Sequence, residues 1–141
     1  MKRALGLSLT LLVFIAFMGC ATKLKNFEPK NQEEASIKKL LLKWESTWNN
    51  HDVEGHLSLW NEKAQIMYGK DRKTATKEEY TKILPERMRT HPEIELGAPA
   101  IELSQNEADA TLSMMIGNHQ TTATFHLVKE NDRWSIMSWN Y

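Results

Sequence analysis

Beyond residue 31, apolar residues first recur at the spacing of an α-helix. From Gln32 to Asn49 they occupy positions i, i+3, i+4, i+7 and i+11, which lie on one face of a helix. Two glutamates in the first turn are favoured there by the helix dipole. The pattern therefore predicts a long amphipathic helix whose apolar face is formed by Ile37, Leu40, Leu41, Trp44 and Trp48.

Two further helices are indicated by their capping residues. Asp52 is a good N-cap for a short helix that we expect to end at Trp60. A capping box at residues 76–79, Thr-Lys-Glu-Glu, opens a third helix. Pro85 lies inside that helix, and we expect it to kink the helix or divide it into two pieces. The apolar stripe of the short second helix consists of Val53, His56, Leu57 and Trp60.

Strand periodicity dominates the remaining chain. A strand is predicted from Ala64 to Tyr68, followed by a charged loop from Gly69 to Ala75. After residue 92, apolar and polar residues alternate in runs separated by turn residues, which predicts an antiparallel meander. The interruption at residues 97–99, Gly-Ala-Pro, indicates a bulge or an edge. Helices followed by strands are typical of an α+β domain, which we place at residues 32–141.

The first 19 residues have the pattern of an export signal. Lys2 and Arg3 precede an apolar run from Ala4 to Met18. This run is shorter than the roughly 20 residues that span a bilayer. A signal anchor or an N-terminal core helix is the alternative, but the run has no polar helical face. We therefore assign residues 1–19 to a cleaved signal peptide.

The end of this run suggests lipid attachment. Phe17-Met18-Gly19-Cys20 resembles the lipobox of bacterial lipoproteins, although leucine is usual where Phe17 stands. An exported chain with one cysteine would otherwise carry a free thiol. The resemblance implies a lipid at Cys20 that holds the protein on a membrane of the cell envelope. Ala21, where inner-membrane relatives often carry aspartate, implies the outer membrane, facing the periplasm, in a host that has one.

Residues 20–31 connect the signal to the domain. They are polar and include Pro29 and three lysines, so we expect a flexible tether. Without residues 1–19, the chain keeps 16 basic and 18 acidic side chains, a formal charge of −2. A chain with this balance lacks the excess of positive charge that binds nucleic acid, so we exclude nucleic acid as a partner.

A set of short motifs occurs in order along residues 32–141. They are Trp44-x-x-x-Trp48, Asp52, Trp60, Ala64-x-Ile66, Phe125-His-Leu-Val-Lys and Arg133-Trp134-Ser-Ile136. This ordered set resembles nuclear transport factor 2-like domains, a superfamily that includes SnoaL-like and ketosteroid-isomerase-like proteins. The resemblance implies a cone, in which a curved antiparallel sheet of the cystatin-like type wraps around N-terminal helices. It also implies a pocket at the open end and homodimers paired through the outer face of the sheet.

Catalysis of the isomerase type is not expected. The resemblance implies an aspartate base on the first strand and a tyrosine of the first helix in an oxyanion hole. Those positions hold Tyr68 and Trp44. Glu93, Glu95 and Glu102 alternate with apolar residues and should face outward. We therefore assign no catalytic residue.

Histidines are the remaining candidates for acid–base chemistry. His56 lies on an apolar stripe, where it either projects into the pocket or is a hydrogen-bonded core residue. The face of His126 is ambiguous from its neighbours. A SnoaL-like enzyme that uses His56 and Tyr68 as acid–base groups is the alternative function. The spacing of His, Cys, Asp and Glu matches no metal site and no Gly-rich phosphate loop is present, so neither a metal nor a cofactor is expected.

Aromatic residues should converge inside a cone of this topology. Plain core packing is the alternative for most of them. A pocket walled by indoles and a methionine suits a flat or apolar small molecule. The expected pocket residues are Trp44, Trp48, His56, Trp60, Tyr68 and Met114.

The C-terminal strand offers an interaction surface. Met137, Trp139 and Tyr141 alternate on the face opposite Trp134 and Ile136, so one face should be core and the other an exposed apolar strip. We assign Met137 and Trp139 to a dimer face. The leading hypothesis is a non-catalytic envelope lipoprotein that binds a small apolar ligand or a partner protein. A pure dimeric assembly module is the third hypothesis, beside the SnoaL-like enzyme.

Overall fold

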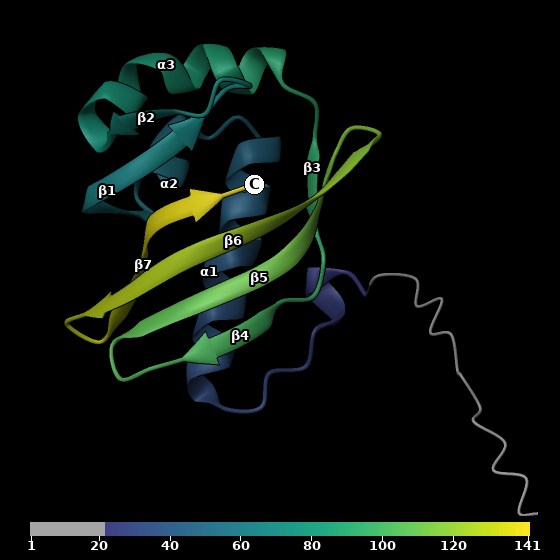
Figure 1. Cartoon of the computed structure of the whole chain (residues 1–141), viewed down its shortest axis with the longest axis vertical. Coiled ribbons are helices and arrows are strands. Elements are labelled where there is room, and N and C mark those ends of the chain that lie inside the picture. Colours follow the sequence, from purple (N-terminus) through teal and green to yellow (C-terminus); the bar gives the residue numbers. More distant parts are fainter. Residues whose placement is uncertain (1–21) are drawn as a thin grey trace, which may run out of the picture.

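The computed structural model describes residues 22–141. The predicted signal peptide and the predicted lipidation site at Cys20 lie outside the described residues. Within residues 22–141, three α-helices accompany one seven-stranded sheet, which confirms the α+β class (Figure 1). The helices are α1 (Gln32–Asn49), α2 (Val53–Leu57) and α3 (Lys77–Thr90), preceded by the short 3₁₀ turn η1 (Leu24–Asn26). The strands are β1 (Trp60–Tyr68), β2 (Lys73–Thr76), β3 (Ile94–Leu96), β4 (Ala100–Leu103), β5 (Glu107–Ile116), β6 (His119–Glu130) and β7 (Arg133–Asn140).

The sheet curves around α1, which lies behind the long diagonal strands β5–β7 in Figure 1. Its strand order is β2-β1-β7-β6-β5-β3, and β4 also pairs with β5. The predicted meander holds for β5, β6 and β7, which pair antiparallel. The expectation of a wholly antiparallel sheet is wrong at one place, because β1 pairs parallel with β7.

Two predicted boundaries also differ in the structure, because β1 pairs with both β7 and β2. The second helix ends at Leu57 rather than Trp60, because the carbonyl of Leu59 accepts the Ile136 amide at 2.9 Å and Trp60 already pairs with Ile136. Pairing with a distant strand here outweighs local helix preference. The predicted loop from Gly69 to Ala75 is also shorter, since its last residues form β2 and make a hairpin with β1.

Helix α3 is one continuous element, so the expected division at Pro85 does not occur. Proline removes the hydrogen bond that would reach the carbonyl four residues earlier. Both Pro85 and Thr81 are exposed, so water can satisfy that carbonyl. The capping box predicted at Thr76 is present in full, with reciprocal bonds between Thr76 and Glu79.

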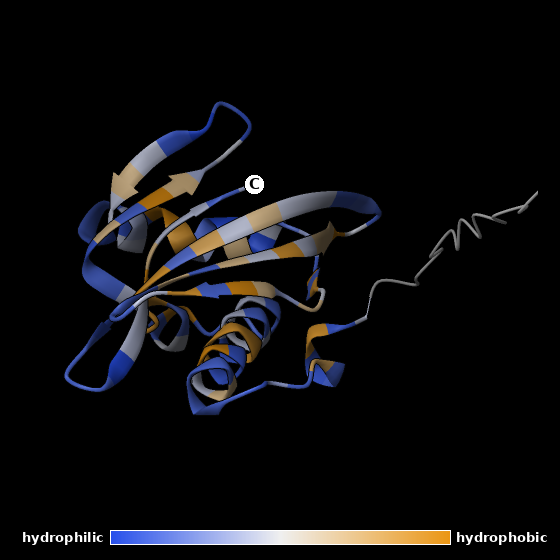
Figure 2. Cartoon of the chain, turned by 60° about the horizontal axis from the view of Figure 1, so that its bottom comes forward, coloured by the Kyte–Doolittle hydropathy of each residue, from blue (hydrophilic) through white to orange (hydrophobic). Residues whose placement is uncertain are grey.

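The core lies between α1 and the concave face of the sheet. Figure 2 shows hydrophobic positions as a stripe along α1 and in alternation along β5–β7. Ile37, Leu41 and Trp44 are completely buried, as the helical periodicity predicts. They meet inward-facing residues of the sheet, which include Ala110, Leu112, Met114, Phe125, Leu127 and Ile136.

The expected flexible tether is packed against the domain from residue 22 onward. We call residues 22–31 the N-terminal strap. Leu24 is only 1% exposed and belongs to the core, and the Thr22 carbonyl accepts the Ala98 amide at 2.6 Å. Lys23 pairs with Gly97 in an antiparallel bridge. The interruption between β3 and β4 therefore provides the edge that the strap covers, and the description of residues 22–31 as a free tether is wrong.

Candidate functional site

The structure brings five of the six predicted pocket residues together, but they form part of the packed core and do not line an open pocket. Trp44, His56 and Met114 have no exposed surface, and Trp60 and Trp48 have 2% and 3%. The Trp44 ring lies 5.2 Å from His56 and from Phe125, and 5.1 Å from Trp139, between ring centroids. We call Trp44, Trp48, His56, Trp60, Phe125 and Trp139 the aromatic cluster. The sixth residue, Tyr68, is half-buried and lies outside it.

His56 is held as a neutral side chain. Its Nδ1 lies 3.1 Å from Thr47 Oγ1, and that hydroxyl is 2.7 Å from the Lys43 carbonyl. Because the hydroxyl proton is directed to the carbonyl, Nδ1–H of His56 must donate to Thr47, which leaves Nε2 as an acceptor. Burial lowers the pKa of His56 to about 4. The imidazole is therefore uncharged near neutral pH and is a weak base.

Three buried polar atoms in the aromatic cluster have no hydrogen-bond partner among the described residues. They are His56 Nε2 and the indole Nε1 atoms of Trp44 and Trp60. Buried polar groups without partners cost stability, commonly about 1–3 kcal/mol each. The aromatic packing around them must offset this cost, so the cluster is held by ring contacts rather than by hydrogen bonds.

His56 and Tyr68 do not form an acid–base pair. Among the described residues they share no ring contact or hydrogen bond, and the ring contacts between them run through Trp60 and Tyr80. Successive centroids on this path are 6.4, 6.2 and 6.4 Å apart. The Tyr68 ring instead lies under the guanidinium of Arg87, 5.5 Å from its centroid. The geometry gives no support to the SnoaL-like enzyme hypothesis.

Carboxylates supply no general base to the interior. Glu93, Glu95 and Glu102 are exposed, as their alternation predicts. In residues 22–141, only three acidic residues are buried or half-buried, and each has a structural partner. Glu33 accepts from Lys129 and Trp134, Glu34 accepts from the Lys30 amide, and Glu45 accepts from the Leu96 amide. Glu45 lies on the side of α1 next to β3, and its partial burial raises its pKa.

An open cavity lies instead at the end of the sheet, where two turns meet the ends of α3 and β7. Its volume is about 450 Å³. We call it the mouth. It is formed by the β1–β2 turn, the end of α3, the β5–β6 turn and the end of β7, in the upper part of Figure 1. Its walls are mainly apolar and consist of Gly69, Lys70, Arg72, His91, Ile116, His119, Thr121 and Tyr141.

The mouth is connected to the aromatic cluster through its floor. Tyr141 packs against Trp139 with centroids 4.5 Å apart, and His91 lies 5.9 Å from Trp48. Arg72 donates to a main-chain oxygen of Tyr141 at 2.8 Å and so fixes the end of β7 to the β1–β2 turn. Burial and the nearby Arg87 lower the pKa of His91. The sequence patterns contain no sign of this site, because its walls come from turns far apart in the chain.

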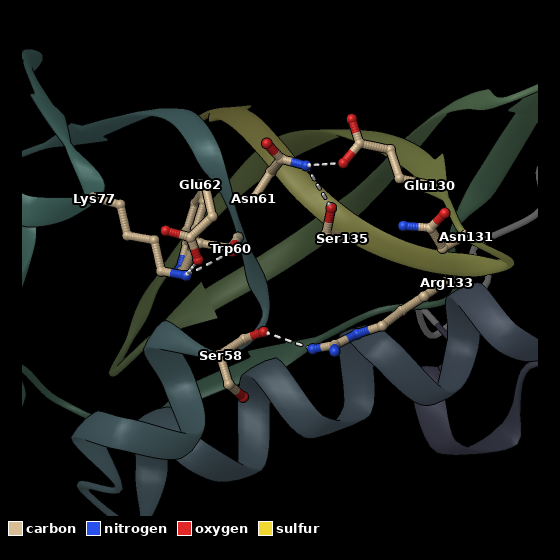
Figure 3. A pocket seen from close by; sticks show the side chains of 9 residues that line it. All are labelled: Ser58, Trp60, Asn61, Glu62, Lys77, Glu130, Asn131, Arg133 and Ser135. Carbon is tan, nitrogen blue, oxygen red and sulfur yellow. Dashed lines mark hydrogen bonds and ion pairs between the residues drawn. The ribbon is translucent and has the colours of Figure 1, made fainter.

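A second, polar cleft of about 310 Å³ lies beside the start of β1 (Figure 3). Asn61 donates to Glu130 at 3.2 Å and to Ser135 at 3.1 Å, and Lys77 donates to Glu62 and to the Trp60 carbonyl. Arg133 donates to the Ser58 carbonyl at 3.2 Å. These groups satisfy one another and join β1 to the β6–β7 turn, so we interpret the cleft as a structural network.

The expected exposed strip on β7 is not present. Trp139 is 5% exposed, and its Nε1 donates to the Met67 carbonyl at 2.8 Å. A bulge opposite His126 and Leu127 breaks the alternation, so Trp134, Ile136 and Trp139 all point inward. Met137, at the bulge, is half-buried. The assignment of Trp139 to an exposed dimer face is therefore wrong.

The outer face of the sheet is polar. His126 and Asp109 form a pair at 2.8 Å across β5 and β6, which resolves the orientation of His126 as outward. Thr111 and Thr124 lie next to them and bond at 3.1 Å.

Within residues 22–141, no three side chains of His, Cys, Asp or Glu gather as metal ligands would. In the same range, no helix combines the length and hydrophobicity needed to cross a membrane.

Solved structures with the same arrangement define the fold. An NTF2-like protein of unknown function from Shewanella baltica OS155 is 17% identical, with a TM-score of 0.63, covering 80% of this chain and 96% of that one. A protein with a cystatin-like fold from Nostoc punctiforme PCC 73102 is also 17% identical, with a TM-score of 0.62 and coverages of 80% and 92%. The chain therefore has the nuclear transport factor 2-like fold that its sequence resembles.

A third similar structure has a name that refers to assembly. It comes from Xanthomonas campestris and is provisionally named a calcium/calmodulin dependent protein kinase II association domain. It is 14% identical, with a TM-score of 0.65, and the match covers 87% of this chain and 94% of that one. No protein-family model and no curated protein sequence matches the chain. At these identities, the comparisons establish the fold alone.

Proposed function

We propose that this chain is a lipid-anchored protein of the bacterial envelope whose domain binds a small molecule at the mouth without transforming it. The lipobox-like Phe17-Met18-Gly19-Cys20 supports the anchor. The domain has the nuclear transport factor 2-like fold. Among the described residues, each buried or half-buried carboxylate has a structural hydrogen-bond partner, and His56 and Tyr68 share no ring contact or hydrogen bond.

One observation carries the binding function. The mouth is an open cavity of about 450 Å³ with mainly apolar walls, whereas the aromatic cluster beneath it is packed. Small-molecule sites commonly have volumes of roughly 300–1,000 Å³ and apolar walls with few polar groups. The mouth meets this description, and it replaces the interior pocket expected from the sequence.

Recovery of a co-purified compound tests the binding function. The full chain is extracted from bacterial membranes in nonionic detergent, and released small molecules are identified by mass spectrometry. We expect a compound that is retained by the wild type and lost in Ile116→Trp, which fills the mouth. Leu103→Trp adds the same bulk at an exposed position of β4 and should retain the compound. Equal retention in Ile116→Trp would contradict binding at the mouth.

The anchor has a separate test. Cys20→Ser removes the only thiol of the chain, and Ala21→Ser is the matched control. We expect the control protein to have a diacylglyceryl-modified N-terminal peptide and to enter the detergent phase with an outer-membrane fraction. The Cys20→Ser protein should lack this modification. An unmodified Cys20 in the mature wild type would refute the lipid anchor.

We propose that the protein forms a homodimer, and the assembly-related name of the Xanthomonas campestris protein supports this oligomeric state. Because the outer sheet face is polar, copies would pair through hydrogen-bonding residues rather than an apolar strip. Thr122→Cys places a thiol on the exposed face of β6, and Lys82→Cys places one on exposed α3 as a control. We expect disulfide-linked dimers in membranes only for Thr122→Cys. Equal cross-linking of both variants would count against this dimer.

A further inference from the structure

Basic side chains predominate at the mouth. Among the residues that line it, Lys70 and Arg72 are cationic, His91 and His119 are basic, and none is acidic. The nearest carboxylates along the chain, Asp71 and Glu93, are exposed and are not among its lining residues. The polar cleft provides a contrast, because there Lys77 is paired with Glu62. In residues 22–141, neither Lys70 nor Arg72 is paired with an Asp or Glu side chain, and Arg72 is held by a main-chain oxygen of Tyr141.

A further basic group, Arg87, lies near the mouth without being among its lining residues. Arg87 is one helical turn before His91 on α3, and its guanidinium covers the Tyr68 ring. Its Nε is buried and has no hydrogen-bond partner among the described residues. A buried guanidinium N–H without an acceptor is unfavourable, and an anionic oxygen is the acceptor that guanidinium groups bind most strongly.

The remaining wall is suited to an apolar body. Ile116, at the end of β5, and Tyr141, which follows β7, line the cavity, and the Tyr141 ring packs against Trp139 with centroids 4.5 Å apart. Both wall residues are only partly buried, so a ligand can cover apolar surface that is now exposed. Basic groups around an apolar patch fit a molecule that has both an anionic group and an apolar body.

We infer that the mouth selects an organic monoanion with an apolar body, of the carboxylate class. This inference rests on the proposed binding function and specifies its ligand. The apolar body lies against Ile116 and Tyr141, and the anionic head lies toward Lys70 and Arg87. An uncharged compound of the same shape keeps the apolar contacts and loses the head contacts, so it binds more weakly.

A pair of probes that differ in one group tests the inference. The probes are 1-naphthylacetate and its uncharged amide, titrated by calorimetry into the full chain in nonionic detergent, with protein-free micelles as the blank. At low salt, we expect the anion to bind about tenfold more tightly than the amide, a difference equivalent to about 1.4 kcal/mol. This preference should shrink in about 0.5 M salt, because exposed charges are screened.

Two variants test which basic side chains bind the anionic head of the ligand. Lys70→Gln, in an exposed turn, should lower the affinity for the anion several-fold and leave the amide unchanged. Arg87→Gln should do the same, and circular dichroism will show whether it remains folded. Lys82→Gln removes an exposed charge on the same helix as Arg87 and should leave both affinities unchanged.

The outcomes separate this inference from the proposed function. If neither probe binds to the wild type, the proposal of small-molecule binding at the mouth fails. If both probes bind equally, the binding function stands and the selection for an anion is wrong. If Lys82→Gln weakens anion binding as much as Lys70→Gln, the preference reflects overall charge, and the inference is again wrong.

Discussion

The interior and the mouth of this small domain use similar residues for opposite purposes. In the aromatic cluster, Trp44, His56 and Trp60 are buried and touch one another, so their rings fill the space that the curved sheet encloses. At the mouth, Tyr141 and His91 are only partly covered and leave a cavity of about 450 Å³. The difference shows that an aromatic residue indicates a binding site only where its ring still has uncovered surface.

This comparison leads to a simple expectation. Substitutions in the aromatic cluster should lower stability, and substitutions at the mouth should lower binding. Each of the following changes tests one side of that division, beginning with the largest effect.

Trp44→Ala should have the largest effect. Trp44 is fully buried and contacts four other aromatic rings. Truncation of such a residue commonly lowers the free energy of unfolding by about 3–5 kcal/mol. Urea unfolding of the variant and of Leu103→Ala, an exposed control, measures the difference. A loss below about 1 kcal/mol would show that the interior is not closely packed.

Acid should weaken the interior through His56. Its pKa is about 4 in the folded protein, against 6.5 for an unperturbed histidine, so between these values the unfolded chain binds a proton and the folded chain does not. Stability is therefore fully present above pH 6.5 and falls by roughly 3 kcal/mol as the pH approaches 4. Urea unfolding at several pH values should show that the free energy of unfolding depends less on pH in His56→Gln than in the wild type. His119→Gln, at the exposed mouth, is the control, and an equally reduced pH dependence in both variants would contradict this origin.

Leu24→Ala tests whether the N-terminal strap belongs to the packed part of the domain. Leu24 is 1% exposed, so its truncation should lower the free energy of unfolding by about 2 kcal/mol, at the lower end for buried leucines. Limited proteolysis should then cleave within residues 22–31 faster than in the wild type. Unchanged stability and unchanged proteolysis would return these residues to the role of a flexible tether.

The smallest change in stability is expected at the mouth. Lys70→Gln replaces an exposed side chain and should alter the free energy of unfolding by no more than about 0.5 kcal/mol. The same variant should lose several-fold in affinity for 1-naphthylacetate. A large loss of stability without a change in binding would reverse the division between the interior and the mouth.

Local patterns in the sequence were sufficient for the first helix and for the general class of the fold. The apolar face of α1 follows directly from helical periodicity, and the capping box at Thr76 marks the start of α3. These features depend on residues within a few positions of each other. The resemblance to nuclear transport factor 2-like domains then provided the curved sheet around a helix, a fold shared with the solved structures, but not the parallel pairing of β1 with β7.

Features that depend on distant pairing were not predictable in the same way. Trp60 satisfies a helical stripe, but its backbone pairs with Ile136 and makes it a strand residue. Trp139 alternates with Met137 in the sequence, but one bulge turns it into the core. The mouth combines the turns after β1 and β5 with the ends of α3 and β7, so no sequence window contains it.

The most direct test of the division between interior and mouth is a two-dimensional ¹⁵N–¹H spectrum of the full chain titrated with 1-naphthylacetate. We predict that the backbone amide signals of Gly69, Ile116 and Thr121 shift, because these residues line the mouth. The indole signals of Trp44 and Trp60 should stay in place. Shifts of those two indole signals, with the mouth amides unmoved, would place the ligand inside the cone and contradict our interpretation.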